Sequence, residues 1–287
     1  MKLYTEILLK KHDKLFGSNA VIVGIGSCFS QYVMELLEQA GFDISSNPNG
    51  IVYNSYSIAM SLERIVTNKP YTETDLLYHN NLWHSWEHHG SFSATSEEYL
   101  LKNIQKASEK NLNKLKRADI FILTPASSVV YCLKENDRII SNCHKYPGNK
   151  LYTKILSVED NLKYLREIIR HIRSINKNCL IVTTLSPVRH YPGDLVLNAR
   201  SKANLLSAIH MALEENKNTV YFPSYEIFLD ELRDYRFCNE DMLHPNILAR
   251  KIIFEKFMNT FFTEECEKKV ELVMKAEKLN CHRKINS

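Results

Sequence analysis

The sequence predicts a three-layer α/β/α sandwich with a mainly parallel sheet at its centre. Apolar runs of strand length recur along the chain, and amphipathic stretches of helical length separate them. Strands separated by helices pair in parallel through right-handed crossovers, so helices cover both faces of the sheet. We interpret four apolar runs as its strands: 19–26, 118–124, 179–185 and 219–224.

Helical patterns fill the intervals between these strands. Residues 29–40 place apolar side chains on one face, and Gly41 supplies a stop. A serine cap and an acidic first turn open the pattern at 96–116. Pro245 opens the pattern at 245–262. The other predicted helices are 55–68, 157–176 and 201–216.

Two segments interrupt the alternation of strand and helix. Residues 69–96 are polar, aromatic and rich in histidine, and they predict no regular element. The stretches 128–133 and 138–143 flank KENDR and predict a short antiparallel excursion.

The domain organisation follows from what the sequence lacks. It has no repeat, no long low-complexity run and no Pro/Gly-rich linker. We interpret residues 1–262 as a single domain and residues 263–287 as a C-terminal helical extension, with its helix at 263–281.

The composition limits the class and the compartment. The chain has 287 residues, 44% of them hydrophobic, which is enough for a large core. The net charge of +4 is small, which argues against nucleic acid or a membrane surface as a partner. No stretch is apolar for long enough to span a bilayer, and no signal-peptide pattern is present. Seven scattered cysteines without CxxC spacing indicate reduced thiols in the cytoplasm.

The stretch GIGSCFS, residues 24–30, places a hydroxyl and a thiol where the first strand runs into a helix. Ligands collect at the carboxyl ends of parallel strands. The free N–H groups of the following helix would stabilise an anion formed there. Ser27 is therefore a candidate nucleophile, and the simpler alternative is that Gly24, Gly26 and Ser27 only make a turn and cap the helix.

A second candidate constellation lies near the other end of the chain. Asp241 and His244 are three residues apart, just before a helix. A serine nucleophile needs a base that takes its proton, and the base needs an acceptor that fixes its tautomer. Ser27, His244 and Asp241 supply such a set, although Asp241 could equally cap a turn and His244 could be a surface residue.

GSCF at 26–29 and NPNGIVYN at 47–54 resemble the GSCFA family, which is placed with the SGNH or GDSL-like serine hydrolases. The resemblance continues in order through nearly the whole chain. It includes HSWEHHGSFS (84–93), ISNCHK (140–145), TLSPVRH (184–190), SKANLL (201–206), YFPSYEIFLDELRDYRF (221–237) and DMLHP (241–245).

This resemblance implies a flavodoxin-like sandwich, a Ser27 nucleophile and an Asp241–His244 base pair. It also implies that Gly50 offers a backbone N–H to the oxyanion, together with the N–H of Ser27. The turn at 124–131, TPASSVVY, departs from the expected pattern, and the usual Gly-x-Asn-Asp block is absent. A third oxyanion donor would then be Ser127 or Asn142.

Cys28 competes with Ser27 for the role of nucleophile. A thiol is intrinsically the better nucleophile, and a helix N-terminus lowers its pKa. However, Cys28 lies one residue further into the helix, where we expect its side chain to turn away from the strand mouth. The resemblance also assigns the role to Ser27, so we expect Cys28 to be a small buried packing residue.

Further polar residues lie in segments that we expect near the site. His84 and His89, in the histidine-rich loop, are candidates for substrate contact. His144 follows the antiparallel excursion, and Arg189 follows a strand end, where it could bind an anionic group or form an ion pair. Asn54, in the NPNGIVYN block, completes this substrate-binding set.

The sequence therefore predicts a cytoplasmic SGNH-like serine ester hydrolase that needs no cofactor. Its substrate would be a small-molecule or glycan ester, such as an acylated or acetylated sugar. Acyl transfer to another alcohol uses the same residues and stays open. A non-catalytic protein that retains the pocket is the alternative from another class. A third interpretation is a metallohydrolase, with His84 and His88 as ligands four residues apart.

Overall fold

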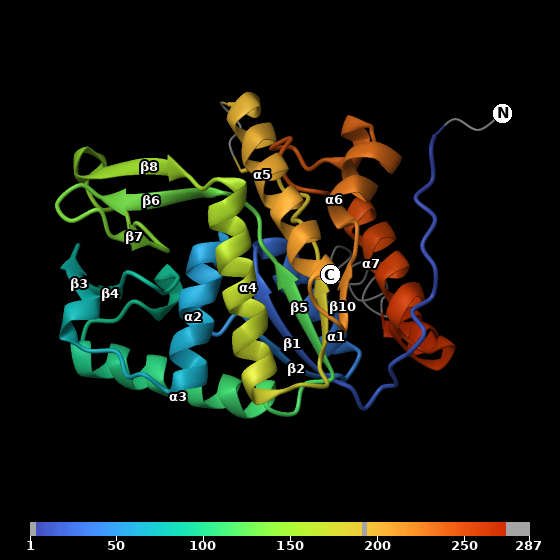
Figure 1. Ribbon diagram of the computed structural model, residues 1–287, viewed down its shortest axis with the longest axis horizontal. Coiled ribbons are helices and arrows are strands. Elements are labelled where there is room, and N and C mark those ends of the chain that lie inside the picture. The colour runs from blue at the N-terminus through green and yellow to red at the C-terminus, as the bar shows by residue number, and fades with distance from the viewer. Residues whose placement is uncertain (1–3, 191–193, 274–287) are drawn as a thin grey trace, which may run out of the picture.

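The computed structural model describes residues 4–190 and 194–273, and a five-stranded parallel sheet forms its centre (Figure 1). The strand order is β10-β9-β5-β1-β2. The bounds of these strands are β1 Val21–Gly26, β2 Asp43–Ser46, β5 Ile120–Thr124, β9 Leu180–Thr183 and β10 Thr219–Tyr221. Renumbered within the sheet, the order is 2-1-3-4-5, the flavodoxin-like order, which reverses between β1 and β5. The predicted α/β fold with a parallel sheet is confirmed.

Helices cover both faces of the sheet and make two separate cores. Residues of α1 (Cys28–Gln39) and α7 (Ile247–Phe261) pack on one face, around Met34, Phe254 and Phe261. On the other face lie α2 (Ser55–Thr67), α4 (Val158–Ile175) and α5 (Leu195–Glu214). The strands are apolar on both faces because both are covered. Figure 1 shows α2, α4 and α5 in front of the sheet.

Short polar side chains set the starts of most of these helices. Asn54 caps α2, Ser157 forms a capping box on α4, and Asn246 caps α7. Helix α3 (Glu97–Leu115) is capped by Ser96. In contrast, the side chain of Ser27 makes no capping hydrogen bond to α1.

Antiparallel structure is added beside the sandwich. The hairpin β3 (Leu76–His79) and β4 (Leu82–Ser85) lies in the segment where no regular element is predicted. The predicted excursion is the sheet β7-β6-β8, with β6 Val129–Leu133, β7 Ile139–Ile140 and β8 Leu151–Ile155. Short helical turns complete the described chain: η1 Glu73–Asp75, η2 Gly90–Phe92, η3 Gly148–Lys150, α6 Ser224–Glu226, η4 Ile227–Glu231 and η5 Tyr235–Phe237.

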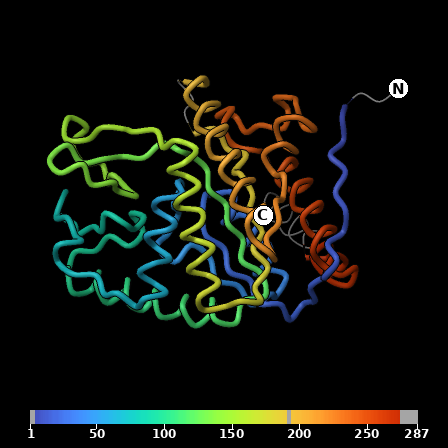
Figure 2. The backbone as a smooth tube through the Cα atoms, viewed as in Figure 1, coloured from blue at the N-terminus to red at the C-terminus, as the bar shows by residue number. Residues whose placement is uncertain are grey.

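The first described residues run in extended form along α7, as the tube in Figure 2 shows. The N–H of His12 donates to the Thr260 carbonyl at 2.8 Å, and the N–H of Phe16 donates to the Phe261 carbonyl at 2.9 Å. Residues 264–273 are helical, and Cys266 is buried in the same core as α7. The rest of the predicted helix, 274–281, lies outside the described residues.

None of the helices in the described part of the chain is long and apolar enough to cross a membrane.

Candidate functional site

The candidate site lies where β1 ends, at the edge where the strand order reverses. Gly26 closes β1 with φ +147°, and a Cβ at this position would lie 2.2 Å from the carbonyl oxygen of Thr124. Only glycine fits this close approach of β1 to β5. The backbone can then turn sharply, so Ser27 and Cys28 follow at the carboxyl edge of the sheet, where ligands bind in open α/β folds.

Ser27 lies at the predicted edge, but its side chain is inaccessible. The residue is 0% exposed, and its N–H donates to the Thr124 carbonyl at 3.0 Å. Its hydroxyl oxygen has no hydrogen-bond partner among the described residues. The predicted hydrogen bond between Ser27 and His244 is therefore not formed in this structure.

Cys28, the first residue of α1, differs from the expectation of a buried packing residue. It is partly exposed and lines a cavity of about 90 Å³. The other residues that line this cavity are Phe29, Val188, Asn239, His244, Pro245 and Arg250. The first position of a helix turns its side chain outward from the buried strand end, whereas the position before it is enclosed. The structure thus brings His244 together with Cys28 rather than with Ser27.

His244 and Asp241 form the hydrogen-bonded pair that their spacing suggested. Nδ1 of His244 lies 2.7 Å from Oδ2 of Asp241. The backbone N–H groups of His244 and Leu243 donate to Oδ1 at 3.0 and 2.9 Å. These N–H groups, and then the His244 side chain, lower the pKa of Asp241 to about 2. A carboxylate at Nδ1 favours the tautomer whose Nε2 can accept a proton, as a general base must.

Arg189 supports the loop that carries this pair. Its N–H donates to the Leu243 carbonyl at 3.1 Å, and its guanidinium donates to the Met242 carbonyl at 3.4 Å. Met242 has a φ of +58°, so the loop turns through a left-handed residue. In this structure Arg189 therefore holds the His244 loop, a role that differs from the predicted anion contact or ion pair.

Two cations lie close to Cys28. Lys202 is 2% exposed, and its Nζ donates to the Ser186 carbonyl at 2.6 Å. Burial lowers the pKa of Lys202 to about 7. Arg250 lines the Cys28 cavity, stacks 4.6 Å from the Tyr32 ring, and has a buried Nε without a partner among the described residues.

The thiol of Cys28 responds to opposing influences. Burial raises its pKa and is the largest effect. The backbone N–H groups of Phe29 and Cys28 oppose it, as do the charges of Lys202 and Arg250. Because burial prevails, the thiol is protonated at rest and needs a base to become a nucleophile.

The predicted oxyanion donors lie away from the Cys28 cavity. The N–H of Gly50, at φ +74°, donates to the Asn47 carbonyl at 2.8 Å. Ser127 is buried, lies 3.1 Å from the Ser201 hydroxyl and accepts from Val129 N–H. The side chain of Asn142 accepts from the N–H of His144 at 3.0 Å. None of these three side chains or N–H groups lines the Cys28 cavity.

The other predicted substrate contacts have structural partners in this structure. His84 lies 2.6 Å from Ser93 Oγ and stacks on His144, whose Nε2 lies 2.7 Å from the Ser85 carbonyl. His89 lies 3.1 Å from Ser91 Oγ, and the side chain of Asn54 caps α2. These side chains order the histidine-rich segment and α2.

A metal centre in the histidine-rich loop finds no ligand set in the described residues. No three His, Cys, Asp or Glu side chains of residues 4–190 and 194–273 are grouped so that they could hold an ion. His88, one of the two candidate ligands, is buried, and its Nδ1 lies 2.8 Å from Ser85 Oγ.

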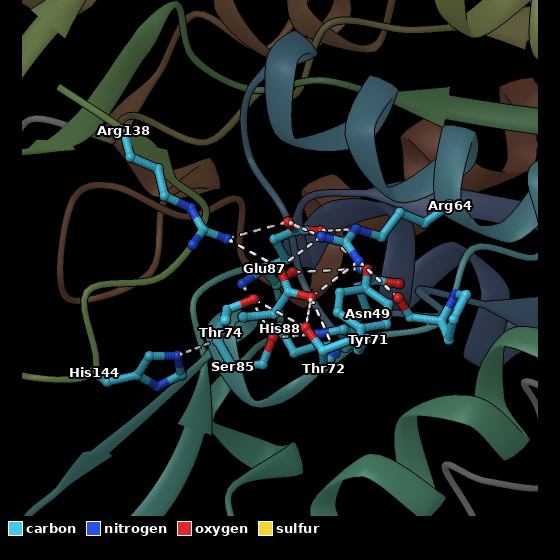
Figure 3. Close-up of polar contacts among 12 residues, drawn as sticks. Asn49, Arg64, Tyr71, Thr72, Thr74, Ser85, Glu87, His88, Arg138 and His144 are labelled. Atoms are coloured by element: carbon cyan, nitrogen blue, oxygen red, sulfur yellow. Dashed lines mark hydrogen bonds and ion pairs between the residues drawn. The ribbon is translucent and has the colours of Figure 1, made fainter. Parts of the chain in front are cut away.

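A polar cluster beneath this loop joins it to α2 (Figure 3). Arg64 of α2 pairs with both carboxylate oxygens of Asp75, at 2.7 and 3.1 Å. It also reaches Glu87, 3.2 Å from Nε to Oε2, and its guanidinium lies 4.1 Å from the Tyr71 ring. Arg138 lies 3.5 Å from the same Glu87. The cluster fixes the loop without lining the Cys28 cavity.

A larger groove of about 1450 Å³ lies between the first described residues and the segment 221–237. Its lining contains neither His nor Cys nor Ser. It therefore offers no nucleophile and base of the kind found beside Cys28, and we place the candidate site in the smaller cavity.

Two of the site residues that our prediction missed, Lys202 and Arg250, have a recognisable signal in the sequence. Lys202 stands three and seven residues before Leu205 and Ile209, on the buried face of α5. A lysine on such a face indicates a buried charge. Arg250 is one helical turn beyond Asn246, on the helix that follows His244. Nothing in the sequence pointed to Asn239.

Fold and site together define a doubly wound α/β protein with a histidine–aspartate pair at the carboxyl edge of its sheet. The chain belongs to the GSCFA family, whose family model matches residues 21–257. Among curated proteins none matches the chain.

Solved structures resemble the chain at low identity. A putative platelet activating factor from Streptococcus pneumoniae has 12% identity and a TM-score of 0.42, over 84% of this chain and 82% of its own. A carbohydrate esterase of family 3 from Talaromyces cellulolyticus has 10% identity and a TM-score of 0.37, over 90% and 98%. An acetyl xylan esterase from Butyrivibrio proteoclasticus has 8% identity and a TM-score of 0.38, over 85% and 63%. At these scores, none of them bears on the activity of this chain.

Proposed function

We propose that this protein is an acyl ester hydrolase in which His244, oriented by Asp241, is the general base. The observation that carries the proposal is the His244–Asp241 pair, which borders the cavity at the start of α1. A base fixed by a carboxylate, beside a nucleophile at a helix N-terminus, is the arrangement that acyl transfer requires.

In the proposed reaction, His244 takes the proton of a nucleophile at the start of α1. The nucleophile attacks the acyl carbonyl, and the tetrahedral intermediate collapses when His244 returns the proton to the leaving alcohol. His244 then deprotonates a water, which releases the acid and restores the nucleophile. An alcohol in place of this water would make the protein an acyltransferase.

The size of the cavity favours a short acyl group. Its volume is about 90 Å³. An acetyl group fits such a space, and the alcohol part would lie outside it. His244 and Asp241 are 41% and 44% exposed at the side chain, so a large alcohol such as a sugar can approach.

The test is a screen of the purified protein against p-nitrophenyl esters of increasing acyl length and against acetylated sugars. We expect turnover to favour the short acyl chains. His244→Ala should lower turnover roughly 100- to 10,000-fold, because proton transfer contributes this much. Asp241→Asn should cost less, and His12→Ala, in the N-terminal segment, should have no effect. Equal turnover in His244→Ala and the wild type would contradict the proposal.

A further inference from the structure

We propose that Cys28, and not Ser27, is the nucleophile of this site, so that the acyl-enzyme is a thioester. This inference rests on the proposed function and specifies its chemistry. The structure assigns the two neighbours different environments, and only one of them is accessible from the cavity that contains the base.

The first argument is access. Ser27 is 0% exposed and is absent from the lining of the cavity. Cys28 is partly exposed and lines the cavity together with His244. An attacked carbonyl must lie against both the nucleophile and the base. The cavity meets this condition for Cys28. For a substrate to reach Ser27, the cavity would have to extend further toward the end of β1.

The second argument is charge. The sulfur of Cys28 faces two backbone N–H groups at the start of α1 and feels the positive charges of Lys202 and Arg250. Each of these favours the thiolate that forms when His244 removes the proton. Tyr53 is also near the thiol, and its phenol stays neutral because burial raises its pKa. The groups around Cys28 thus favour negative charge, and none of them is a carboxylate.

The third argument concerns the oxyanion, since the predicted donors Ser27 N–H and Gly50 N–H are already used. Asn239 and Arg250 line the cavity beside Cys28. The side-chain amide of Asn239 borders the cavity, and the buried Nε of Arg250 has no partner among the described residues. Both side chains can donate to the oxygen of an attacked carbonyl.

The reaction balances with the residues present. The thiol proton moves to Nε2 of His244, a C–S bond forms to the carbonyl carbon, and the C–O bond to the alcohol breaks. The alcohol leaves with the proton from His244. Water then adds to the thioester while His244 accepts its proton, the C–S bond breaks, and the thiol is restored.

The first experiment measures thiol reactivity without any substrate. The protein is treated with iodoacetamide at pH 7.5, and labelling of each cysteine peptide is followed by mass spectrometry. We expect Cys28 to react faster than Cys143, which is also partly exposed but does not line the cavity that contains His244. His244→Ala should slow the labelling of Cys28 by about 100-fold or more, and that of Cys143 not at all. Labelling of Cys28 that is no faster than that of Cys143, or that does not depend on His244, would overturn the inference.

The second experiment separates the two neighbours by substitution. Ser27→Ala removes a hydroxyl that has no partner among the described residues, so it should leave the fold and the turnover of p-nitrophenyl acetate nearly intact. Cys28→Ala should lower turnover by about 100-fold or more, with an unchanged circular dichroism spectrum, and Cys143→Ser should match the wild type. Acetyl trapped on Cys28 would support the inference. Acetyl on Ser27, or loss of turnover in Ser27→Ala alone, would refute it.

The two proposals can fail separately. If no ester is turned over, the proposed hydrolase is wrong, while His244-dependent labelling still identifies Cys28 as an activated thiol. If esters are turned over but the adduct is found on Ser27, the hydrolase stands and the inference falls.

Discussion

The ionisable amine of Lys202 is buried in the interior, between α5 and the carboxyl edge of the sheet. The side chain is 2% exposed, and within the described part of the chain it donates to a single acceptor, the Ser186 carbonyl. Tyr225 offers its ring face at 5.6 Å, and Cys28 lies close enough to interact with the charge. A charge buried with so few partners destabilises the fold.

This cost should depend on pH in a defined direction. The ordinary pKa of 10.5 falls to about 7 on burial, so the unfolded chain binds the proton more tightly than the folded one. Below pH 7 both states are charged and the full cost is present. Between pH 7 and 10.5 the folded state sheds the proton first, so stability rises with pH.

We therefore expect the Lys202→Met substitution to raise the free energy of unfolding more at acidic pH than at alkaline pH. Its free energy of unfolding relative to the wild type should be higher at pH 6 than at pH 9, by about 2–3 kcal/mol. Loss of the hydrogen bond to Ser186 changes the free energy of unfolding equally at both pH values, so it cancels in this difference. Urea unfolding at the two pH values measures this difference, with the partly exposed Lys251→Met as control. An equal effect at both pH values would mean that Lys202 keeps its proton in the folded protein at pH 9 as well as at pH 6, contrary to a lowered pKa.

At this scale the sequence predicted where the candidate site lies, at Ser27 and its neighbour Cys28. The GSC triplet marked the position, and the spacing of Asp241 and His244 indicated their mutual contact. Whether the serine or the cysteine enters the cavity depends on how the chain leaves β1. That exit is fixed by the approach of Gly26 to Thr124, a tertiary contact that no local pattern encodes.

Among the elements, the β3–β4 hairpin depends on the polar cluster at Arg64 (Figure 3). The side chains of Arg64, Asp75 and Glu87 are 14%, 12% and 16% exposed. In such a cluster, loss of one partner leaves the others charged and poorly solvated. The hairpin is therefore held to α2 by charge pairing in addition to its small apolar clusters.

Arg64→Met should cost about 3–5 kcal/mol, because Asp75 and Glu87 would lose their main counter-charge. Arg166→Met removes an ion pair with Glu215 that is 51% and 42% exposed, and it should cost only ~0–1 kcal/mol. Urea unfolding compares the two variants, and limited proteolysis should show cleavage within residues 69–96 in Arg64→Met only. Similar small losses in both variants would show that the hairpin is held by apolar packing alone.

The elements were predicted where their pattern is strong. The apolar strands β1, β5 and β9 and the amphipathic helix α4 have bounds within a few residues of those predicted. The edge strand β2, with the sequence DISS, is too short and polar to be recognised. The hairpin was missed because charge pairs and histidine hydrogen bonds define it, and these leave no periodic pattern in the sequence.

For the whole molecule, the parallel sheet and its two helical layers followed from the alternation of strands and helices. The strand order did not, because it depends on which strands pair across the core. The candidate site could not be predicted for the same reason. Its cavity is lined by Cys28, at the start of α1, and by His244, just before α7, and these residues meet only when the sheet is assembled.

Several buried histidines make the stability of the whole fold decrease at acidic pH. Burial lowers the pKa of His88 to about 3 and that of His190 to about 3 from an ordinary value of 6.5. His144 is shifted in the same direction, to about 4. Above pH 6.5 both the folded and the unfolded states are neutral. Below pH 6.5 these histidines bind protons in the unfolded chain but stay neutral in the folded protein. The free energy of unfolding therefore falls as the pH falls.

We expect the free energy of unfolding to decrease by roughly 6 kcal/mol between pH 7.5 and pH 5. This is about 2 kcal/mol for each of His88, His190 and His144. Urea denaturation at the two pH values tests the size of the fall. The variant His88→Asn should reduce the difference by about one third, because the unfolded chain then has one proton fewer to gain. His12→Ala should leave the difference unchanged. If wild-type stability were equal at pH 7.5 and pH 5, these histidines would have to be accessible to protons in the folded state, contrary to their burial.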